Sequence, residues 1–214
     1  MSKRNFLKSS AILGSAGLLT PGLVFAAGAP PQVGKDYRVI QPPQRTEVAE
    51  GKIEVIEFFW YACPHCYALE PVIHDWAAKL PADVELRRVH VAFRAPRHQQ
   101  IFYTLLALKE DQRLGGKVFE AIHKDRKRME DTAEIFAWAK DQGLDEALFK
   151  KTFDSFGIRT AMKRASQQVE SFGVDGVPAL AVGGKYLTAP SMAGSNGRAL
   201  EVVDSLIDLE RKAG

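Results

Sequence analysis

Cysteine is scarce in this sequence, which has only two such residues among 214, both within one tetrapeptide. A structural zinc site needs four protein ligands, so Cys63 and Cys66 would have to be joined by two histidines. The five histidines are scattered along the chain at no paired spacing, and we therefore expect no bound metal and no other cofactor. A chain of this length also buries enough surface to fold without covalent cross-links, so the cysteines are not explained as a structural staple.

Long apolar runs are also missing. The most apolar segment, Ala11 to Phe25, is short and is interrupted by glycines and Pro21, so it would span a bilayer poorly. It follows a basic start and ends in Val24-Phe25-Ala26, which has small residues at the two positions that a signal peptidase reads. We predict a signal peptide over 1–26, cleaved near Ala26, with an uncleaved membrane anchor as the alternative. The start resembles a twin-arginine signal with Lys3 in place of the first Arg, so export by either the Sec or the twin-arginine route is possible.

Surplus charge of either sign is absent from the predicted mature chain. The whole sequence has 29 basic and 26 acidic residues, and residues 1–26 hold three of the basic ones and none of the acidic ones. Removal of this segment leaves 26 of each, a formal net charge of zero. One basic cluster stands out, at Lys124, Arg126, Lys127 and Arg128. It has no interleaved aromatic residues, which favours a solvated helix end over a nucleic-acid-binding patch.

Hydrophobic periodicity predicts alternating strands and helices in the first part of the mature chain. A short extended piece at Tyr37–Ile40 is followed by the apolar run from Ile53 to Phe59, which is short enough for a buried strand. From Cys63 to Lys79 apolar residues recur every three or four positions, which predicts a helix with a kink at Pro71. Val84 to Phe93 is predicted to form a second strand.

The rest of the chain is mainly helical in pattern. Between His98 and Phe156 we predict several helices, one capped by Thr132 and another beginning at Asp145, separated by glycines at 115, 116, 143 and 157. A further helix has its apolar face at 158–172. The last elements are a hairpin of strands Ala179–Val182 and Lys185–Leu187 around a two-residue Gly183-Gly184 turn, and a helix at Arg198–Lys212.

This order of elements predicts an α/β fold. A β-α-β unit and a β-β-α unit form one mixed central sheet with helices on both faces. We assign 27–94 and 157–214 to this domain, and 95–156 to a helical insertion between the two units.

The tetrapeptide Cys63-Pro64-His65-Cys66 lies at the start of a predicted helix. Pro64 suits the first helical turn, and the free N–H groups and dipole of that end favour a thiolate at Cys63. Cys66 lies one turn inside, where its sulfur can open or close a ring with Cys63. His65 points outward and can stabilise the thiolate, although an exposed polar residue in a turn is the alternative. This arrangement favours a redox pair over half of a zinc site.

Further motifs accompany the tetrapeptide, and together they resemble the DsbA family of bacterial periplasmic thiol oxidases. They are Glu57-Phe58-Phe59, Tyr67 and Glu70 around the cysteines, His90-Val91-Ala92-Phe93, Gly176-Val177-Pro178-Ala179 and Val182-Gly183-Gly184-Lys185-Tyr186. The likeness covers most of the mature chain. This sequence departs from the better-known members at Trp60-Tyr61-Ala62 and at Arg88, where those have Lys.

The resemblance implies a thioredoxin-like fold and a location in the periplasm. It also implies a cis bond before Pro178 beside the cysteines, with Val177 and Pro64 as substrate-binding residues, because a cis X-Pro bond exposes the preceding backbone to an extended substrate. Glu57 would act as a proton acceptor or relay beneath Cys66. The alternatives are a Pro178 that merely begins a strand and a Glu57 that is a solvated edge carboxylate, although a buried unpaired carboxylate is costly without a role.

The expected activity is donation of a Cys63–Cys66 disulfide to reduced exported polypeptides. The family implies reoxidation by a DsbB-type membrane quinone oxidoreductase, and we expect a monomer that does not bind nucleic acid. A disulfide reductase or isomerase on the same fold is the nearest alternative. A non-catalytic binder of unfolded chains is an alternative of another class.

Overall fold

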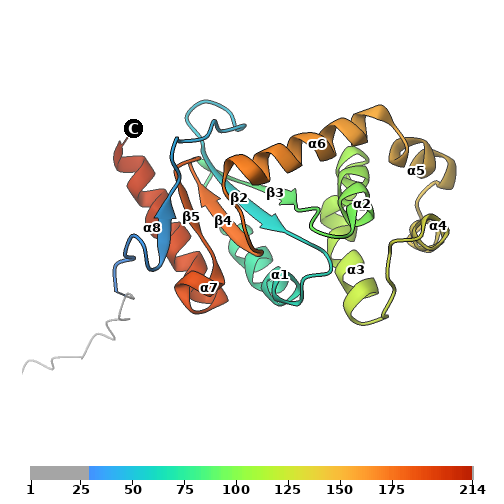
Figure 1. The fold of residues 1–214 in the computed structure, drawn as a ribbon, viewed down its shortest axis with the longest axis horizontal. Helices are drawn as coiled ribbons and strands as arrows, with labels where there is room; N and C mark the ends of the chain where they lie inside the picture. Colours follow the sequence, from blue (N-terminus) through green and yellow to red (C-terminus); the bar gives the residue numbers. More distant parts are fainter. Residues whose placement is uncertain (1–28, 214) are drawn as a thin grey trace, which may run out of the picture.

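The computed structural model describes residues 29–213, so the predicted signal peptide lies outside the described residues. Its sheet contains β1 (Tyr37–Val39), β2 (Ile53–Phe59), β3 (Val84–His90), β4 (Ala179–Val182) and β5 (Tyr186–Thr188), in the order β1-β5-β4-β2-β3. Strands β2 and β3 pair in parallel, and the other neighbouring strands pair antiparallel. The mixed sheet with its surrounding helices confirms the predicted α/β class (Figure 1).

Helices cover both faces of this sheet. Their bounds are α1 (Pro64–Ala77), α2 (Pro96–Ala107), α3 (Asp111–His123), α4 (Thr132–Asp141), α5 (Glu146–Phe153), α6 (Phe156–Ser171), α7 (Pro190–Ala193) and α8 (Asn196–Ala213). Because successive side chains of a strand point to opposite faces, Val55 of β2 packs with α1 and α8, whereas Ile56 and Phe58 pack with α6. Figure 1 shows α6 on the opposite side of the sheet from α1.

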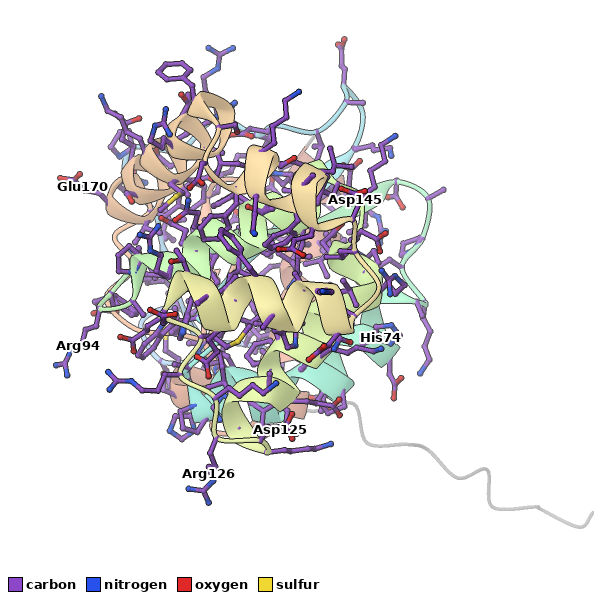
Figure 2. The ribbon with its side chains drawn as sticks, turned by 90° about the vertical axis from the view of Figure 1, so that its right-hand side faces the viewer. His74, Arg94, Asp125, Arg126, Asp145 and Glu170 are labelled. Atoms are coloured by element: carbon purple, nitrogen blue, oxygen red, sulfur yellow. The ribbon has the colours of Figure 1, made fainter. Side chains whose placement is uncertain are left out.

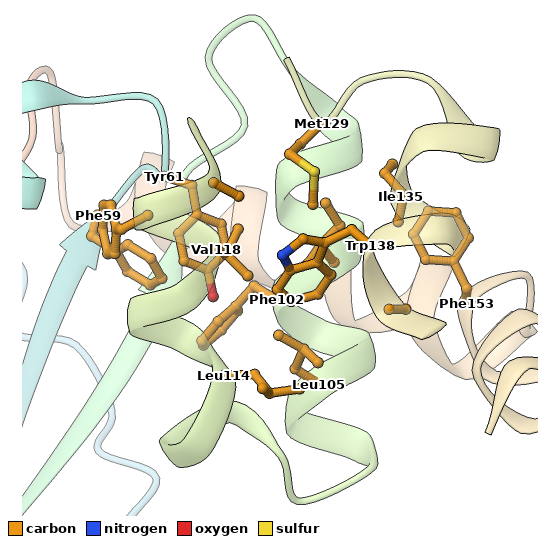
Figure 3. Close-up of a cluster of buried hydrophobic side chains, with 14 of the residues drawn as sticks. Phe59, Tyr61, Phe102, Leu105, Leu114, Val118, Met129, Ile135, Trp138 and Phe153 are labelled. Atoms are coloured by element: carbon orange, nitrogen blue, oxygen red, sulfur yellow. The ribbon is translucent and has the colours of Figure 1, made fainter. Parts of the chain in front are cut away.

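The helices between β3 and α6 enclose an apolar cluster of their own. Figure 3 shows side chains from this cluster, among them Phe102 and Leu105 of α2, Leu114 and Val118 of α3, and Ile135 and Trp138 of α4. The same cluster includes Phe59 at the end of β2, Tyr61, and both cysteines. The core of these helices is therefore continuous with the residues that carry the tetrapeptide.

Two strand predictions need correction. Strand β3 ends at His90 rather than Phe93, because its partner β2 ends at Phe59, the residue opposite His90. Phe93 is exposed. The loop between β4 and β5 holds three residues rather than two, since Val182 pairs with Tyr186. Gly183 and Gly184 adopt φ values of 57° and 67° in this loop, a conformation that costs glycine little.

The helical segment also differs in detail from the prediction. The N-cap of α4 is Asp131 rather than Thr132, and its carboxylate accepts from the N–H groups of Ala133 and Glu134 at 2.8 and 3.2 Å. A carboxylate is the better acceptor at the positive end of a helix. Asp145 was predicted to begin the next helix; it is the N-cap of α5 and accepts from the N–H of Leu148 at 2.7 Å.

Not every glycine in this segment separates helices. Gly115 and Gly116 lie inside α3, and Gly157 lies inside α6, so the predicted breaks there are wrong. Helix propensity is a weak preference that tertiary packing overrides. Pro71 likewise lies within the span of α1.

Among residues 29–213, no helix combines the length and apolar character needed to cross a membrane. The same residues contain no group of three His, Cys, Asp or Glu side chains placed to hold a metal ion.

Candidate active site

The tetrapeptide lies where β2 ends and the chain turns into α1. Cys63 is the N-cap of α1 and Pro64 is its first residue, as predicted. The backbone N–H of Cys66 donates to Cys63 Sγ over 3.4 Å, which satisfies one of the free N–H groups of the first helical turn. Cys63 is 7% exposed and Cys66 is 0% exposed. Cys63 is therefore nearly buried, yet it is the cysteine of the pair that meets the surface.

The two sulfurs differ strongly in acidity. The pKa of Cys63 is lowered to about 6, mainly because the Cys66 thiol donates a hydrogen bond to its sulfur, while burial opposes this effect. Backbone N–H groups of Cys66 and His65 lower the pKa of Cys63 further, and the charge of His65 adds a smaller effect. Burial raises the pKa of Cys66 far above that of an ordinary thiol. At neutral pH, Cys63 is therefore mainly a thiolate and Cys66 a thiol.

A groove opens beside Cys63 on the β4 side. It has a volume of about 640 Å³, and its lining includes His65, Val177, Pro178 and Met192. The Val177–Pro178 peptide bond is cis, as the resemblance implied, and Pro178 directly precedes β4. The Cys63 thiol, when protonated, can donate to the Val177 carbonyl oxygen at 3.4 Å. The groove therefore brings three of the predicted site residues, His65, Val177 and Pro178, to one surface beside Cys63. Pro64 is exposed in the first turn of α1 but does not line the groove.

Glu57 lies fully buried on the face of β2 that packs against α1, in phase with Val55. This burial excludes the solvated edge carboxylate. The Nε of Arg88 donates to Glu57 over 2.6 Å, and the guanidinium of Arg88 makes two further bonds to Glu70 at 3.1 and 2.5 Å. Glu57 is therefore paired, and the unpaired carboxylate considered from the sequence does not occur.

The pairing leaves part of Glu57 free. Burial raises the pKa of Glu57 above its usual value, and the charge of Arg88 opposes this effect. Its Oε1 atom is buried and has no hydrogen-bond partner among the residues that the structure describes. The charge of Glu57 is also one of the causes that raise the pKa of Cys66, which places the carboxylate within electrostatic reach of that sulfur.

Arg88 differs from the Lys of the better-known DsbA family members, and no motif in the sequence assigns it to the site. The parallel register places Ile53 opposite Val84 and therefore Glu57 opposite Arg88. Counting from the first residue of each predicted strand would have found this pair, because parallel strands keep one offset along their length. The pairing follows from register rather than from any local motif.

A second residue that the sequence did not reveal is His123, at the end of α3. Its Nε2 lies 2.8 Å from the carbonyl oxygen of Tyr61, and its ring stacks on Tyr67 with 4.7 Å between the centroids. Both partners flank the tetrapeptide. No pattern near residue 123 signals these contacts, because they join segments far apart in the sequence. Helix α3 therefore fixes the loop that presents Cys63.

Comparison with known proteins agrees with this geometry. A family model described as DSBA-like thioredoxin domain matches residues 96–199. The chain is 46% identical over 201 residues to the thiol:disulfide interchange protein DsbA of Bordetella parapertussis, covering 92% of this chain and 95% of that protein. It is 39% identical to the protein of the same name from Pseudomonas syringae pv. tomato, covering 98% and 97% of the two chains.

A solved structure shares the fold as well. The crystal structure of Pseudomonas aeruginosa DsbA superposes with a TM-score of 0.81 at 39% identity, covering 84% of this chain and 94% of that one. The fold is therefore thioredoxin-like, as the resemblance implied. With relatives this similar over nearly their whole length, the chain belongs to the DsbA family of thiol:disulfide interchange oxidoreductases.

Proposed function

We propose that this protein is a periplasmic thiol oxidase that donates a Cys63–Cys66 disulfide to newly exported polypeptides. The observation that carries the proposal is the contrast between the cysteines, with the pKa of Cys63 lowered to about 6 and that of Cys66 raised by burial. A thiolate at Cys63 stabilises the reduced protein. A stable reduced form favours transfer of the disulfide from the protein to its substrate.

The reaction consists of two exchange steps. A substrate thiolate attacks Cys63 Sγ, so that a mixed disulfide forms while the Cys63–Cys66 bond breaks and Cys66 takes up a proton. A second substrate thiolate then attacks the substrate sulfur of the mixed disulfide, and Cys63 leaves as a thiolate. The substrate loses two electrons and the protein gains them. A low pKa makes Cys63 the better leaving group in this second step.

Three side chains assist these steps in the proposal. His65 stabilises the Cys63 thiolate from the exposed first turn of α1. Glu57 delivers the proton to Cys66 and removes it on reoxidation, which is supported by its full burial, its raised pKa and its free Oε1. Arg88 is a positioning residue that holds Glu57 and Glu70 in place through its three hydrogen bonds.

The substrate binds as an extended segment. Val177 offers its backbone beside Cys63, Pro178 shapes that edge, and Pro64 forms the exposed rim on the α1 side. An extended chain that pairs with a free strand edge gains main-chain hydrogen bonds with little dependence on sequence. Such binding suits a protein that must accept many different polypeptides.

The cellular setting follows from the same proposal. The signal peptide is removed near Ala26, the mature protein is a monomer in the periplasm, and a DsbB-type membrane quinone oxidoreductase restores the disulfide. Residues 27–94 and 157–214 form the thioredoxin-like domain, and 95–156 form a helical insertion. Amino-terminal sequencing of the mature protein should begin at or near Ala27. Retention of Met1 in a cytosolic protein would exclude the export route.

The decisive measurement is the reduction potential of the Cys63–Cys66 pair in a glutathione redox buffer. We expect a value well above about −270 mV, which is typical of thioredoxin. A value at or below that level would make the protein a reductant and overturn the proposal. The double variant Cys63→Ser/Cys66→Ser should lose all oxidation of a reduced polypeptide. If it kept its effect on unfolded chains, the protein would be a non-catalytic binder.

A further inference from the structure

A second hollow lies on the side of Cys63 away from the Val177 groove. It has a volume of about 400 Å³, and six of its residues define what we call the basic pocket: Trp60, Ala62, Arg94, His98, Arg126 and Lys127. Strand β2 lies between β4 and β3 in the sheet. The Val177 groove is built at the start of β4 and the basic pocket just beyond the end of β3, so the two flank the cysteine at the end of β2.

The pocket carries unbalanced positive charge. Among residues 29–213, no carboxylate lies within ion-pair distance of Arg94, Arg126 or Lys127. Arg128 and Glu130 also line the hollow and pair with each other over 3.4 Å, so the one carboxylate in its lining is matched by its own arginine. Figure 2 shows Arg94 and Arg126 extending outward along the same margin of the molecule, at the lower left of the view. The basic cluster expected to be a solvated helix end is exposed at Lys124, Arg126 and Arg128 and half-buried at Lys127. All of its members except Lys124 line the hollow, beside the active-site loop.

Two polar atoms of the pocket residues are buried without partners. Trp60 Nε1 is a donor with no acceptor among the described residues, and His98 Nδ1 also lacks a partner there. The Nε2 of His98 lies 2.8 Å from the carbonyl oxygen of Arg128, which can only accept, so Nε2 carries the hydrogen and Nδ1 is an acceptor. Buried polar groups without partners are costly, and a carboxylate, which only accepts, can relieve that cost at Trp60 Nε1 but not at His98 Nδ1.

The loop that supplies the cations is held in place. Met129 is fully buried, and its N–H donates to a carboxylate oxygen of Glu134 over 2.7 Å. Arg126 and Met129 have φ values of 61° and 54°, a left-handed conformation that side chains other than glycine rarely adopt. Surrounding contacts must therefore hold the loop in this shape. The side chains of Arg126 and Lys127 therefore extend from a backbone that is held in one conformation.

We propose that the basic pocket binds an acidic side chain of the substrate polypeptide, within a few residues of the cysteine that attacks Cys63. The inference rests on the proposed thiol oxidase function and names a feature of its preferred substrates. The carboxylate lies among Arg94, Arg126 and Lys127, and the Trp60 ring turns to bring its buried Nε1 donor to it. Phe93 is 44% exposed and meets the Trp60 ring edge-on at 6.4 Å, which adds an apolar rim for a neighbouring side chain.

The test compares the oxidation of reduced two-cysteine peptides by the oxidised protein, followed by acid quench and chromatography. One peptide has Gln both two residues before and two residues after the first cysteine. Two others replace the first or the second Gln with Glu, so that both chain directions across Cys63 are sampled. We expect one Glu peptide to react about fivefold faster than the Gln peptide, the factor for about 1 kcal/mol from an exposed ion pair.

Variants of the protein locate the effect. The ratio of Glu to Gln rates should fall to about one in Arg94→Gln/Arg126→Gln and should decrease in Trp60→Phe, which keeps a ring but loses the donor. Lys151→Gln/Lys163→Gln removes the same charge from exposed positions on α5 and α6 and should keep the ratio. Equal rates for all three peptides, or a ratio that both double variants lower equally, would overturn the inference. Failure to oxidise even the Gln peptide would instead contradict the proposed function.

Discussion

Replacing Cys66 with Ala tests directly what makes Cys63 acidic. The hydrogen bond from the Cys66 thiol is the largest cause of the low pKa of Cys63. A hydrogen bond to a charged group contributes about 1.5–3 kcal/mol, and one pKa unit corresponds to about 1.4 kcal/mol. A thiol is a weak donor, so the lower end of that range applies. We expect the titration midpoint of Cys63 to rise by about one pH unit in Cys66→Ala.

Cys66→Ser is the matched control. Its hydroxyl can still donate to Cys63 Sγ, and the backbone N–H of residue 66 keeps its own 3.4 Å bond in both variants. The rate of alkylation of Cys63 by iodoacetamide, measured from pH 4 to 9, gives the midpoint. The Ser variant should stay close to the value of about 6 for the native dithiol, whereas the Ala variant should not. Equal midpoints in the two variants would refute the assignment of the Cys66 hydrogen bond as the main cause.

The same acidity makes the stability of the reduced protein depend on pH. A lowered folded pKa stabilises the fold fully above the unfolded value, about 8.5, and this contribution is lost as the pH falls through about 6. At pH 7 the protein is one pH unit above its folded midpoint, which gives at most ~1.4 kcal/mol, or ~30 mV of reduction potential. Solvent screens part of this stabilisation, so we expect between half and all of the maximum contribution. Urea unfolding of the reduced protein at pH 5 and pH 8 measures the difference.

Three further substitutions follow from the structure. His65→Ser should move the Cys63 midpoint upward by less than Cys66→Ala does, because His65 is exposed and its charge is the smaller cause; a larger shift would contradict this order. Arg88→Met leaves the buried Glu57 without its partner, so urea unfolding at pH 7.5 should show a loss of about 3–5 kcal/mol. The raised pKa of Glu57 means that its protonated form is favoured in the fold, so this loss should shrink toward pH 4.5, and an equal loss at both pH values would refute the reasoning. Gly184→Ala should destabilise the protein by about 2 kcal/mol or more in urea unfolding, because φ is 67° and a Cβ would overlap the carbonyl oxygen of Gln44. Gly197→Ala, with open space around it, should be nearly neutral in the same assay.

The sequence by itself determined the features that depend on short stretches of chain. The strand Ile53–Phe59 was predicted with its observed bounds, because a short apolar run of β-branched and aromatic residues is typical of a buried strand. The cap position of Cys63 and the first-turn position of Pro64 followed from the same local logic. The phase of Glu57 with Val55 fixed the face on which the carboxylate is buried. These are properties of neighbours in the chain.

Only the tertiary structure decided which distant groups meet. Glu57 acquires Arg88 through the register of two strands, and His123 reaches the Tyr61 carbonyl from α3 across 62 residues. The limited exposure of Cys63 and the strength of its hydrogen bond from Cys66 also depend on packing around both sulfurs. The basic cluster is the clearest case, because its charge can be read from the sequence, whereas its position beside Trp60 depends on the fold. Electrostatic interactions and burial depend on separation in space, and the folding of the whole chain sets that separation.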